Sequence, residues 1–327
     1  RMLVGVLGEC LFFGVAVGAA SYSFDSKLKC LIGANYYAHH EMWDHVLEAA
    51  RGDAGNPVVI HEVNRALFQT GRLADEMFSH PQHPSALFLE FGRSLYWHKV
   101  GFWLDVGFIN LAEHNLAQAI EVWGEHPAIL KQLALVHLVK GNTGAARIYL
   151  NALTRTLFGD DWADDYLQKL EHDPELANDE RIQRLRSLMP ESNVLIADHG
   201  GESWLAELLA EHPNNRAAFE YLMASYLLTD QPEKVVENIR RLGDLEYARP
   251  FLPEHYAEAA VVHASISRKA LDLHGWRIRP DTERRFAECR DVVMRGRGDR
   301  ETVARELRER FPGSYYRYCF VKESGDP

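Results

Sequence analysis

Sixteen histidines and 47 acidic residues make metal binding the first chemistry to consider in this chain. The densest group of such residues is His39, His40, Glu41, Asp44 and His45. On one helix His40 and Asp44 would be neighbours one turn apart, as would Glu41 and His45, so two ligands could share a face. A turn is expected near Glu41, however, and the flanking aromatic residues are typical of an ordinary contact between helices. The sequence therefore predicts no metal site here.

Three further stretches imitate functional motifs without completing them. "HEVNR" begins like the helix of a zinc protease, but Arg65 stands where the second histidine ligand is needed. "SHPQHP" (Ser79–Pro84) predicts a rigid loop with exposed histidines, and a partner contact or a weak metal site stays open as an alternative. The acids of "FGDDWADDY" suit a helix start, where they complement the helix dipole and need no cation. No phosphate-binding glycine loop or nucleophile elbow occurs, so no cofactor is expected. Whether the chain is an enzyme is uncertain, and a non-enzymatic role is favoured.

The composition allows one large core or two smaller ones, since 46% of the 327 residues are hydrophobic. The net charge is −11, and residues 1–239 hold 18 basic and 32 acidic side chains. Phosphate binding needs a basic surface, so nucleic acid is not an expected partner. The four cysteines are far apart and lack the spacing of a zinc or redox site.

The chain opens with an apolar run over residues 2–20 that contains one charge, Glu9. A helix of that length spans about 28 Å, close to the hydrocarbon thickness of a bilayer. We interpret residues 1–24 as a transmembrane helix in which Glu9 faces protein or water, because a carboxylate at mid-depth costs a few kcal/mol. A signal peptide ending near "GAAS" and a buried helix of a soluble core are the alternatives.

After Ser26 apolar residues recur at helical spacing, and alternation typical of strands is almost absent. The clearest unit is Pro127 to Gly159, with Gly141-Asn142 as the turn between two helices, and a second copy begins at Pro213. Such hairpins of about 34 residues are typical of tetratricopeptide-like repeats. The predicted fold class is all-α, a tetratricopeptide-like helical-hairpin solenoid preceded by one transmembrane helix, with an irregular helical bundle as the alternative.

The predicted organisation after the first helix has three parts. They are helical repeats over 25–171, a polar connection over 172–200, and helical repeats with a C-terminal cap over 201–327. The charged outer face of the last helices would shield the stacked core. We expect the aromatic tail "YYRYCFV" to pack back onto this cap.

The order of these segments resembles that of a bacterial membrane-protein family of unknown function, domain of unknown function 6057. The phrases that carry the resemblance are "FDSKLKCLIGANYYAHHEMWDHVLEAARG", "NPVVIHEVNRALFQTGRLADEMFSHPQ", "ARIYLNALTRTLFGDDWADDYLQ" and "RAAFEYLMASYLLTDQPEKVVENI". The chain is similar to the C-terminal portion of that family over about residues 2–265. The resemblance implies a many-span membrane protein with a tetratricopeptide-like region. Residues 1–24 would then be the last span of a bundle in the bacterial cell membrane, on a side that stays open. It implies no catalytic residue.

The inner groove of the predicted repeats is the expected binding surface, because the first helix of each pair lines it. Tyrosine and tryptophan there would suit recognition of a protein segment. The predicted groove residues are Tyr36, Tyr37, Asn64, Trp97, Trp103, His137, Tyr221 and Tyr226. For each of them, burial between helices is the alternative.

Three functional hypotheses follow. The first is a membrane-tethered, non-enzymatic scaffold that binds a protein partner. The second is an accessory domain of a multi-span membrane enzyme or transporter that handles an envelope or lipid-linked substrate, with Glu9 on its pathway. The third is a soluble scaffold, which requires residues 2–20 to lie in the core. None of them identifies a small-molecule substrate.

Overall fold

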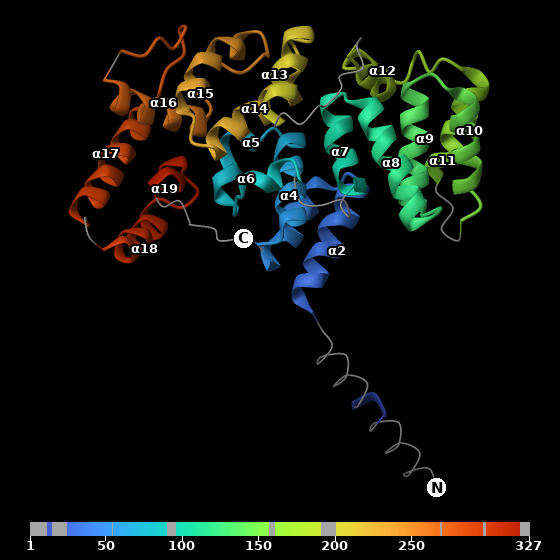
Figure 1. The fold of residues 1–327 in the computed structure, drawn as a ribbon, viewed down its shortest axis with the longest axis horizontal. Helices are drawn as coiled ribbons and strands as arrows, with labels where there is room; N and C mark the ends of the chain where they lie inside the picture. Colours follow the sequence, from blue (N-terminus) through green and yellow to red (C-terminus); the bar gives the residue numbers. More distant parts are fainter. Residues whose placement is uncertain are drawn as a thin grey trace.

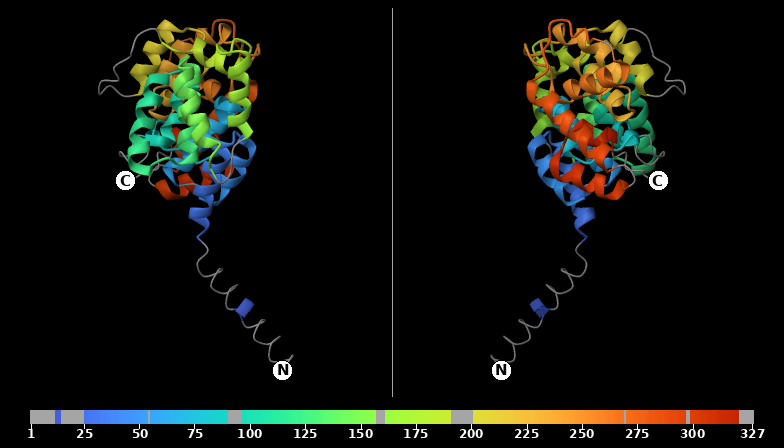
Figure 2. Two further views of the ribbon diagram at one scale, coloured as in Figure 1. Left: turned by 90° about the vertical axis from the view of Figure 1, so that its right-hand side faces the viewer. Right: turned by 90° about the vertical axis from the view of Figure 1, so that its left-hand side faces the viewer.

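The computed structural model describes residues 12–14, 25–53, 55–89, 96–156, 161–190, 201–268, 270–296 and 299–320. Within these ranges the chain consists of helices and loops, and the only β pairing is an isolated bridge between Phe251 and Arg277. The predicted all-α class is therefore confirmed. Figure 1 shows α9–α11 at one end of the molecule and α16–α18 at the other, with α4–α6 between them. The two side views of Figure 2 look onto these two ends.

The N-terminal half is a series of helices that mostly pack as consecutive neighbours. They are α2 (Ser26–His39), α3 (Trp43–Ala49), η1 (Ala50–Gly52), α4 (Pro57–Gln69), α5 (Leu73–Glu76), η2 (Met77–Ser79), α6 (Pro84–Leu87), α7 (Tyr96–Val106), α8 (Ile109–Trp123), α9 (Pro127–Val139), α10 (Thr143–Leu153), α11 (Asp161–His172) and α12 (Glu180–Ser187). Helix α12 lies within the stretch predicted as a polar connection, and residues 191–200 of that stretch lie outside the described residues.

The C-terminal half continues with helices that end in a small cluster. They are α13 (Gly201–Glu211), α14 (Arg216–Leu228), α15 (Pro232–Asn238), η4 (Ile239–Gly243), α16 (Glu254–Ser267), α17 (Pro280–Arg295), α18 (Arg300–Arg310) and α19 (Tyr315–Phe320). The aromatic tail packs back as expected, since Tyr315 and Tyr316 of α19 are fully buried. The hydroxyl of Tyr316 donates to the carbonyl of Thr282 in α17, which fixes α19 against that helix.

Helices α9 and α10 form the hairpin predicted from the clearest repeat unit. Pro127 occupies the first position of α9, where its missing N–H is no loss. The chain reverses at Gly141, whose φ of 72° lies in the left-handed region that glycine adopts most readily. Apolar residues at helical spacing, such as Leu133 and Leu150, are buried where the two helices meet.

The packing departs from a strict solenoid in the middle of the chain. In a solenoid each repeat contacts only its neighbours. Here α5 packs against α14 and α16, and α6 packs against α14. Between α4 and α6 the chain forms only the short α5 and η2, and Phe78 of η2 packs against Tyr315 of the C-terminal half. The solenoid part of the predicted fold class is corrected accordingly.

The predicted transmembrane helix is wrong for the part of the chain that the structure describes. A helix needs about 20 predominantly apolar residues to span a bilayer. The longest described helix, α17, has 16 residues and many charged side chains. No described helix is both long and apolar enough to cross a membrane. Of residues 1–24 only 12–14 are described, as a helical turn, and Glu9 lies outside the described residues.

One long-range contact between the two halves is a helix cap, and it gives a stability prediction. Asp75 of α5 accepts a hydrogen bond from the backbone N–H of Glu254, the first residue of α16, at 2.7 Å. An Asp75→Ala substitution removes this acceptor, so we expect it to lower the free energy of unfolding by about 1 kcal/mol in urea titrations. Asp75→Asn keeps an acceptor oxygen and should lose much less. Equal stabilities of the two variants would contradict this role.

Candidate functional site

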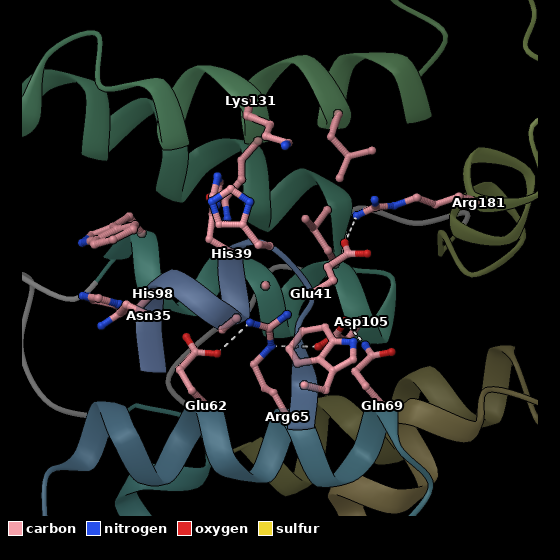
Figure 3. A pocket seen from close by; sticks show the side chains of 18 of the residues that line it. Asn35, His39, Glu41, Glu62, Arg65, Gln69, His98, Asp105, Lys131 and Arg181 are labelled. Atoms are coloured by element: carbon pink, nitrogen blue, oxygen red, sulfur yellow. Dashed lines mark hydrogen bonds and ion pairs between the residues drawn. The ribbon is translucent and has the colours of Figure 1, made fainter. Parts of the chain in front are cut away.

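A cavity of about 320 Å³ opens where α2, α4, α7 and α9 face one another, with α11 and α12 at its edge (Figure 3). Three of these helices, α2, α7 and α9, are the first helices of hairpins with α3, α8 and α10. The cavity therefore lies between the first helices of three hairpins and α4. Its lining combines tryptophan, histidine, amide and charged side chains from seven helices.

The floor of the cavity is a buried group of three charged residues, Glu62, Arg65 and Asp105. Nη1 of Arg65 donates to Oε2 of Glu62 at 2.9 Å, and Nε donates to Oδ2 of Asp105, also at 2.9 Å. The side chains of Glu62, Arg65 and Asp105 are only 4%, 10% and 11% exposed. Gln69 adds a 2.7 Å hydrogen bond to the other oxygen of Asp105. We call Glu62, Arg65 and Asp105 the ion triad.

Burial governs the protonation of the ion triad. Desolvation raises the pKa of the Glu62 carboxyl above its ordinary value, and the guanidinium of Arg65 only partly opposes this. The pKa of Asp105 is raised for the same reason and with the same opposing neighbour. The pKa of Arg65 is itself raised, because the attraction of Asp105 and Glu62 outweighs its own desolvation. One permanent cation thus lies between two carboxylates, and burial disfavours the charged form of each carboxylate.

The position of Arg65 depends on a glycine in the opposite helix. A Cβ atom at Gly101 of α7 would overlap the guanidinium carbon and both terminal nitrogens of Arg65. Trp43 covers the guanidinium on another side, with 5.4 Å between its ring centroid and Cζ. Arg65 is therefore held by charge, by a close backbone approach and by an aromatic face.

Three half-buried tryptophans from different helices contribute the aromatic walls: Trp43 of α3, Trp97 of α7 and Trp162 of α11. Trp97 lies against His98, with ring centroids 4.1 Å apart. The ammonium of Lys131 in α9 lies 5.1 Å from the ring of Trp162. The cavity therefore offers flat apolar surfaces beside its polar floor.

The rim carries both signs of charge. Glu41, in the turn before α3, forms an ion pair with Arg181 of α12 (Figure 3). Arg184, one turn further along α12, is exposed at the edge of the cavity. The pKa of His98 is lowered to about 4 by burial, so this imidazole is neutral at physiological pH. The cavity has no large excess of one charge.

The structure places the eight predicted groove residues in three environments. Four are buried among the helices: Asn64, Trp103, Tyr221 and Tyr226. Three are half-buried: Tyr37, Trp97 and His137. Only Tyr36 is largely exposed, at 56%, and only Trp97 lines the cavity.

Two of these residues have structural partners that account for their positions. Asn64 and Gln82 exchange a pair of 3.0 Å amide hydrogen bonds, so the "SHPQHP" loop closes over α4 through its glutamine. His137 stacks on Tyr149 with ring centroids 5.4 Å apart and planes inclined by 5°. Both residues stabilise contacts between elements of the fold.

The stretches considered for metal binding separate in the structure. His39, His40 and Glu41 line the cavity, whereas His45 packs on Tyr37 with ring centroids 5.2 Å apart. In the described ranges no group of three or more histidine, cysteine, aspartate or glutamate side chains could hold a metal ion. Asp165 pairs with Lys169 one turn later in α11, as an exposed i,i+4 ion pair.

"HEVNR" is the stretch whose meaning changes most. His61 is completely buried, its Nδ1 donates to the carbonyl of Leu87 at 3.0 Å, and burial lowers its pKa to about 3. Glu62 and Arg65 of the same stretch form the ion triad, which the sequence interpretation did not foresee. The available signal was four polar residues, at positions 61, 62, 64 and 65, inside an otherwise apolar helix. Such residues are buried only when they have partners.

Comparison with known proteins identifies the family to which the chain belongs. The model of the family of unknown function DUF6057 matches residues 3–322, so the chain belongs to that family, and the resemblance seen in the sequence is confirmed. The match extends beyond the expected residue 265 to the C-terminal cap. It carries no support for membrane spans or for tetratricopeptide character. Neither the curated proteins nor the solved structures yield a match.

Removing the central cation should unbalance the ion triad. Arg65→Met leaves two buried carboxylates without a counterion, and we expect a loss of about 3–5 kcal/mol in the free energy of unfolding at neutral pH. A carboxyl whose pKa is raised by folding contributes stability at low pH and loses it as pH rises through the folded pKa. The deficit should therefore shrink between about pH 7.5 and about pH 5. Urea unfolding at both pH values measures it.

The exposed Arg284→Met variant is the control for Arg65→Met. Arg284 is 70% exposed and pairs with Asp281 within α17, so its loss should cost about 1 kcal/mol or less. A deficit for Arg65→Met as small as that of the control, or one independent of pH, would contradict the electrostatic account of the ion triad.

The close approach at Gly101 gives a second stability prediction. Gly101→Ala should displace Arg65 and lower the free energy of unfolding by about 1–3 kcal/mol, as overpacking does. Gly144→Ala is the matched control, because Gly144 also lies in a helix but has no atom within 4 Å of an added Cβ. That control should gain up to about 1 kcal/mol from helix propensity. Thermal and urea unfolding of both variants measure these changes. An unchanged free energy of unfolding for Gly101→Ala would contradict the close packing of Arg65 against α7.

Proposed function

We propose that this member of the DUF6057 family is a binding domain that holds a compact polar ligand in the cavity between α2, α4, α7 and α9. The observation that carries the proposal is the cavity itself, with its aromatic walls and its ion triad. Ligand pockets in proteins typically occupy about 300–1,000 Å³ and combine apolar walls with a few fixed polar groups. The cavity of about 320 Å³ belongs at the lower end of that range, which favours a small ligand or the end group of a larger one.

The engagement of the two carboxylates supports binding rather than catalysis. A general acid or base must exchange a proton with a bound substrate through a free and positioned oxygen. Both oxygens of Asp105 and Oε2 of Glu62 already accept hydrogen bonds from Arg65 and Gln69, which leaves Oε1 of Glu62 as the one carboxylate oxygen of the ion triad that could exchange a proton. These bonds fix the side chains in place, which suits a rigid recognition surface.

The protein partner expected from the sequence stays a prediction. Its predicted contact residues are mostly buried, so an approaching protein surface would meet few of the aromatic anchors that such recognition requires. Under the present proposal a partner would reach the cavity only through a projecting group. A small envelope or lipid-linked substrate, as in the second hypothesis, also suits a cavity of this size.

Site-specific photo-crosslinking tests the proposal. A photoreactive phenylalanine analogue at position 184 lies at the edge of the cavity, and the same analogue at position 148 lies on the outer helix α10, where Ile148 is 68% exposed. After irradiation in cells that make the full chain, intact mass spectrometry is expected to show a discrete adduct at position 184 and none at position 148. Adduct formation at both positions to the same extent, or at neither, would overturn the proposed function.

A further inference from the structure

Three polar groups that line the cavity have atoms without a hydrogen-bond partner among the described residues. Nη2 of Arg65 has none, while its Nε and Nη1 are both engaged in the ion triad. Oε1 of Gln132 in α9 and Nδ1 of His98 in α7 are buried and have none either. A buried polar atom without a partner costs about 1–3 kcal/mol. The cavity thus presents polar atoms on three different helices that an occupant can satisfy.

The charges around these atoms disfavour a charged occupant. An anion that approached Arg65 would meet the carboxylates of Glu62 and Asp105, which already neutralise the guanidinium. A cation would meet the ammonium of Lys131 on the opposite wall (Figure 3), and the carboxylates that could attract it already accept hydrogen bonds from Arg65 and Gln69. Like charges in a partly desolvated site repel strongly because screening is weak there. An uncharged ligand avoids both penalties.

The aromatic walls add a requirement for flat apolar faces. Trp43, Trp97 and Trp162 line the cavity, and the half-buried Trp97 lies against His98 on the same helix, with ring centroids 4.1 Å apart. An occupant must therefore carry apolar C–H surface for the indoles and, around its edge, groups that both donate and accept hydrogen bonds. A hydroxyl does both, since it has one hydrogen to donate and two lone pairs.

We infer that the ligand is an uncharged saccharide of one or two rings. Its C–H face packs on Trp97, and its hydroxyls pair with Nη2 of Arg65, Oε1 of Gln132 and the neutral imidazole of His98. This inference rests on the proposed function, because it names the occupant of the same cavity. The volume of about 320 Å³ suits such a ligand better than an extended chain.

Titration calorimetry of the full chain tests the inference with defined probes. The panel is glucose, galactose, mannose, maltose and lactose, with N-acetylglycine amide as an uncharged amide and inorganic phosphate as an anion. We expect saturable binding of at least one saccharide and of neither control compound. Gln132→Leu removes the amide without changing the size of the side chain greatly, and it should weaken saccharide binding about tenfold.

Two tryptophan variants locate the binding. Trp97→Ala should also weaken binding about tenfold or more, and Trp97→Phe should restore part of it because an aromatic face remains. Trp123→Ala is the matched control, since Trp123 is 60% exposed at the end of α8 and does not line the cavity. It should bind as the unaltered chain does. Circular dichroism of each variant establishes that the helices are intact.

The outcomes separate this inference from the proposed function. The amide or phosphate could bind while no saccharide does, and this binding could be lost in Gln132→Leu. That result would overturn the saccharide inference but would still support a binding cavity. Saccharide binding that neither Gln132→Leu nor Trp97→Ala changes would overturn the assignment to this cavity. A discrete adduct at position 184 together with no saccharide binding would overturn the inference alone. If neither an adduct at position 184 nor saccharide binding is observed, the proposed function is overturned as well.

Discussion

The ion pairs of Arg65 with Glu62 and Asp105 are the interaction on which the N-terminal half of the structure depends. Arg65 and Glu62 lie on α4, and Asp105 lies on α7, so a single guanidinium links α4 to the first helix of the α7–α8 hairpin. The link requires a glycine at position 101, where the guanidinium lies against the backbone of α7. The cavity lies directly above this link, and its shape therefore depends on the length and charge of one side chain.

Helix α4 explains why the ion triad is buried. Every residue from Val58 to Leu67 is buried, so α4 lies at the centre of the molecule and has no solvent face. Its polar side chains must then find partners within the protein, because a buried polar group without one is costly. Their partners are the Leu87 carbonyl for His61, Arg65 of the same helix for Glu62, Gln82 for Asn64, and Asp105 for Arg65. These partners specify how α6, α7 and the "SHPQHP" loop pack around the helix.

The all-α class and the hairpin of α9 and α10 could be predicted because their signals are local. Apolar spacing, a proline at a helix start and a glycine at a turn act within a few residues. The position of α4 could not be predicted in this way. Gln82 lies 18 residues after Asn64, and Asp105 lies 40 residues after Arg65. Phe68 of α4 also contacts Tyr221 of α14 in the C-terminal half, with ring centroids 5.5 Å apart.

The residues of the candidate site could not be predicted for the same reason, because their surroundings depend on contacts between distant parts of the chain. Asn64, Tyr221 and Tyr226 were expected to face a groove on the pattern of one-dimensional repeats, and all three are buried. Asn64 pairs with Gln82, and Tyr221 lies against Phe68 of α4 and Phe102 of α7. Trp97 was the one predicted residue that lines the cavity. The charged residues of "HEVNR" stood out in the sequence, but only the fold shows that they pair with each other and with α7.

The retention of a buried ion triad is itself informative about the cavity. Well-packed apolar residues often replace such a group without loss of stability, because the desolvation of the charges offsets most of their attraction. Stability alone therefore gives little reason to keep two carboxylates and a guanidinium at this position. Arg65 retains an unpaired Nη2 at the cavity, which an apolar side chain could not offer. Under the proposed function, this fixed donor flanked by fixed acceptors discriminates among uncharged polar ligands.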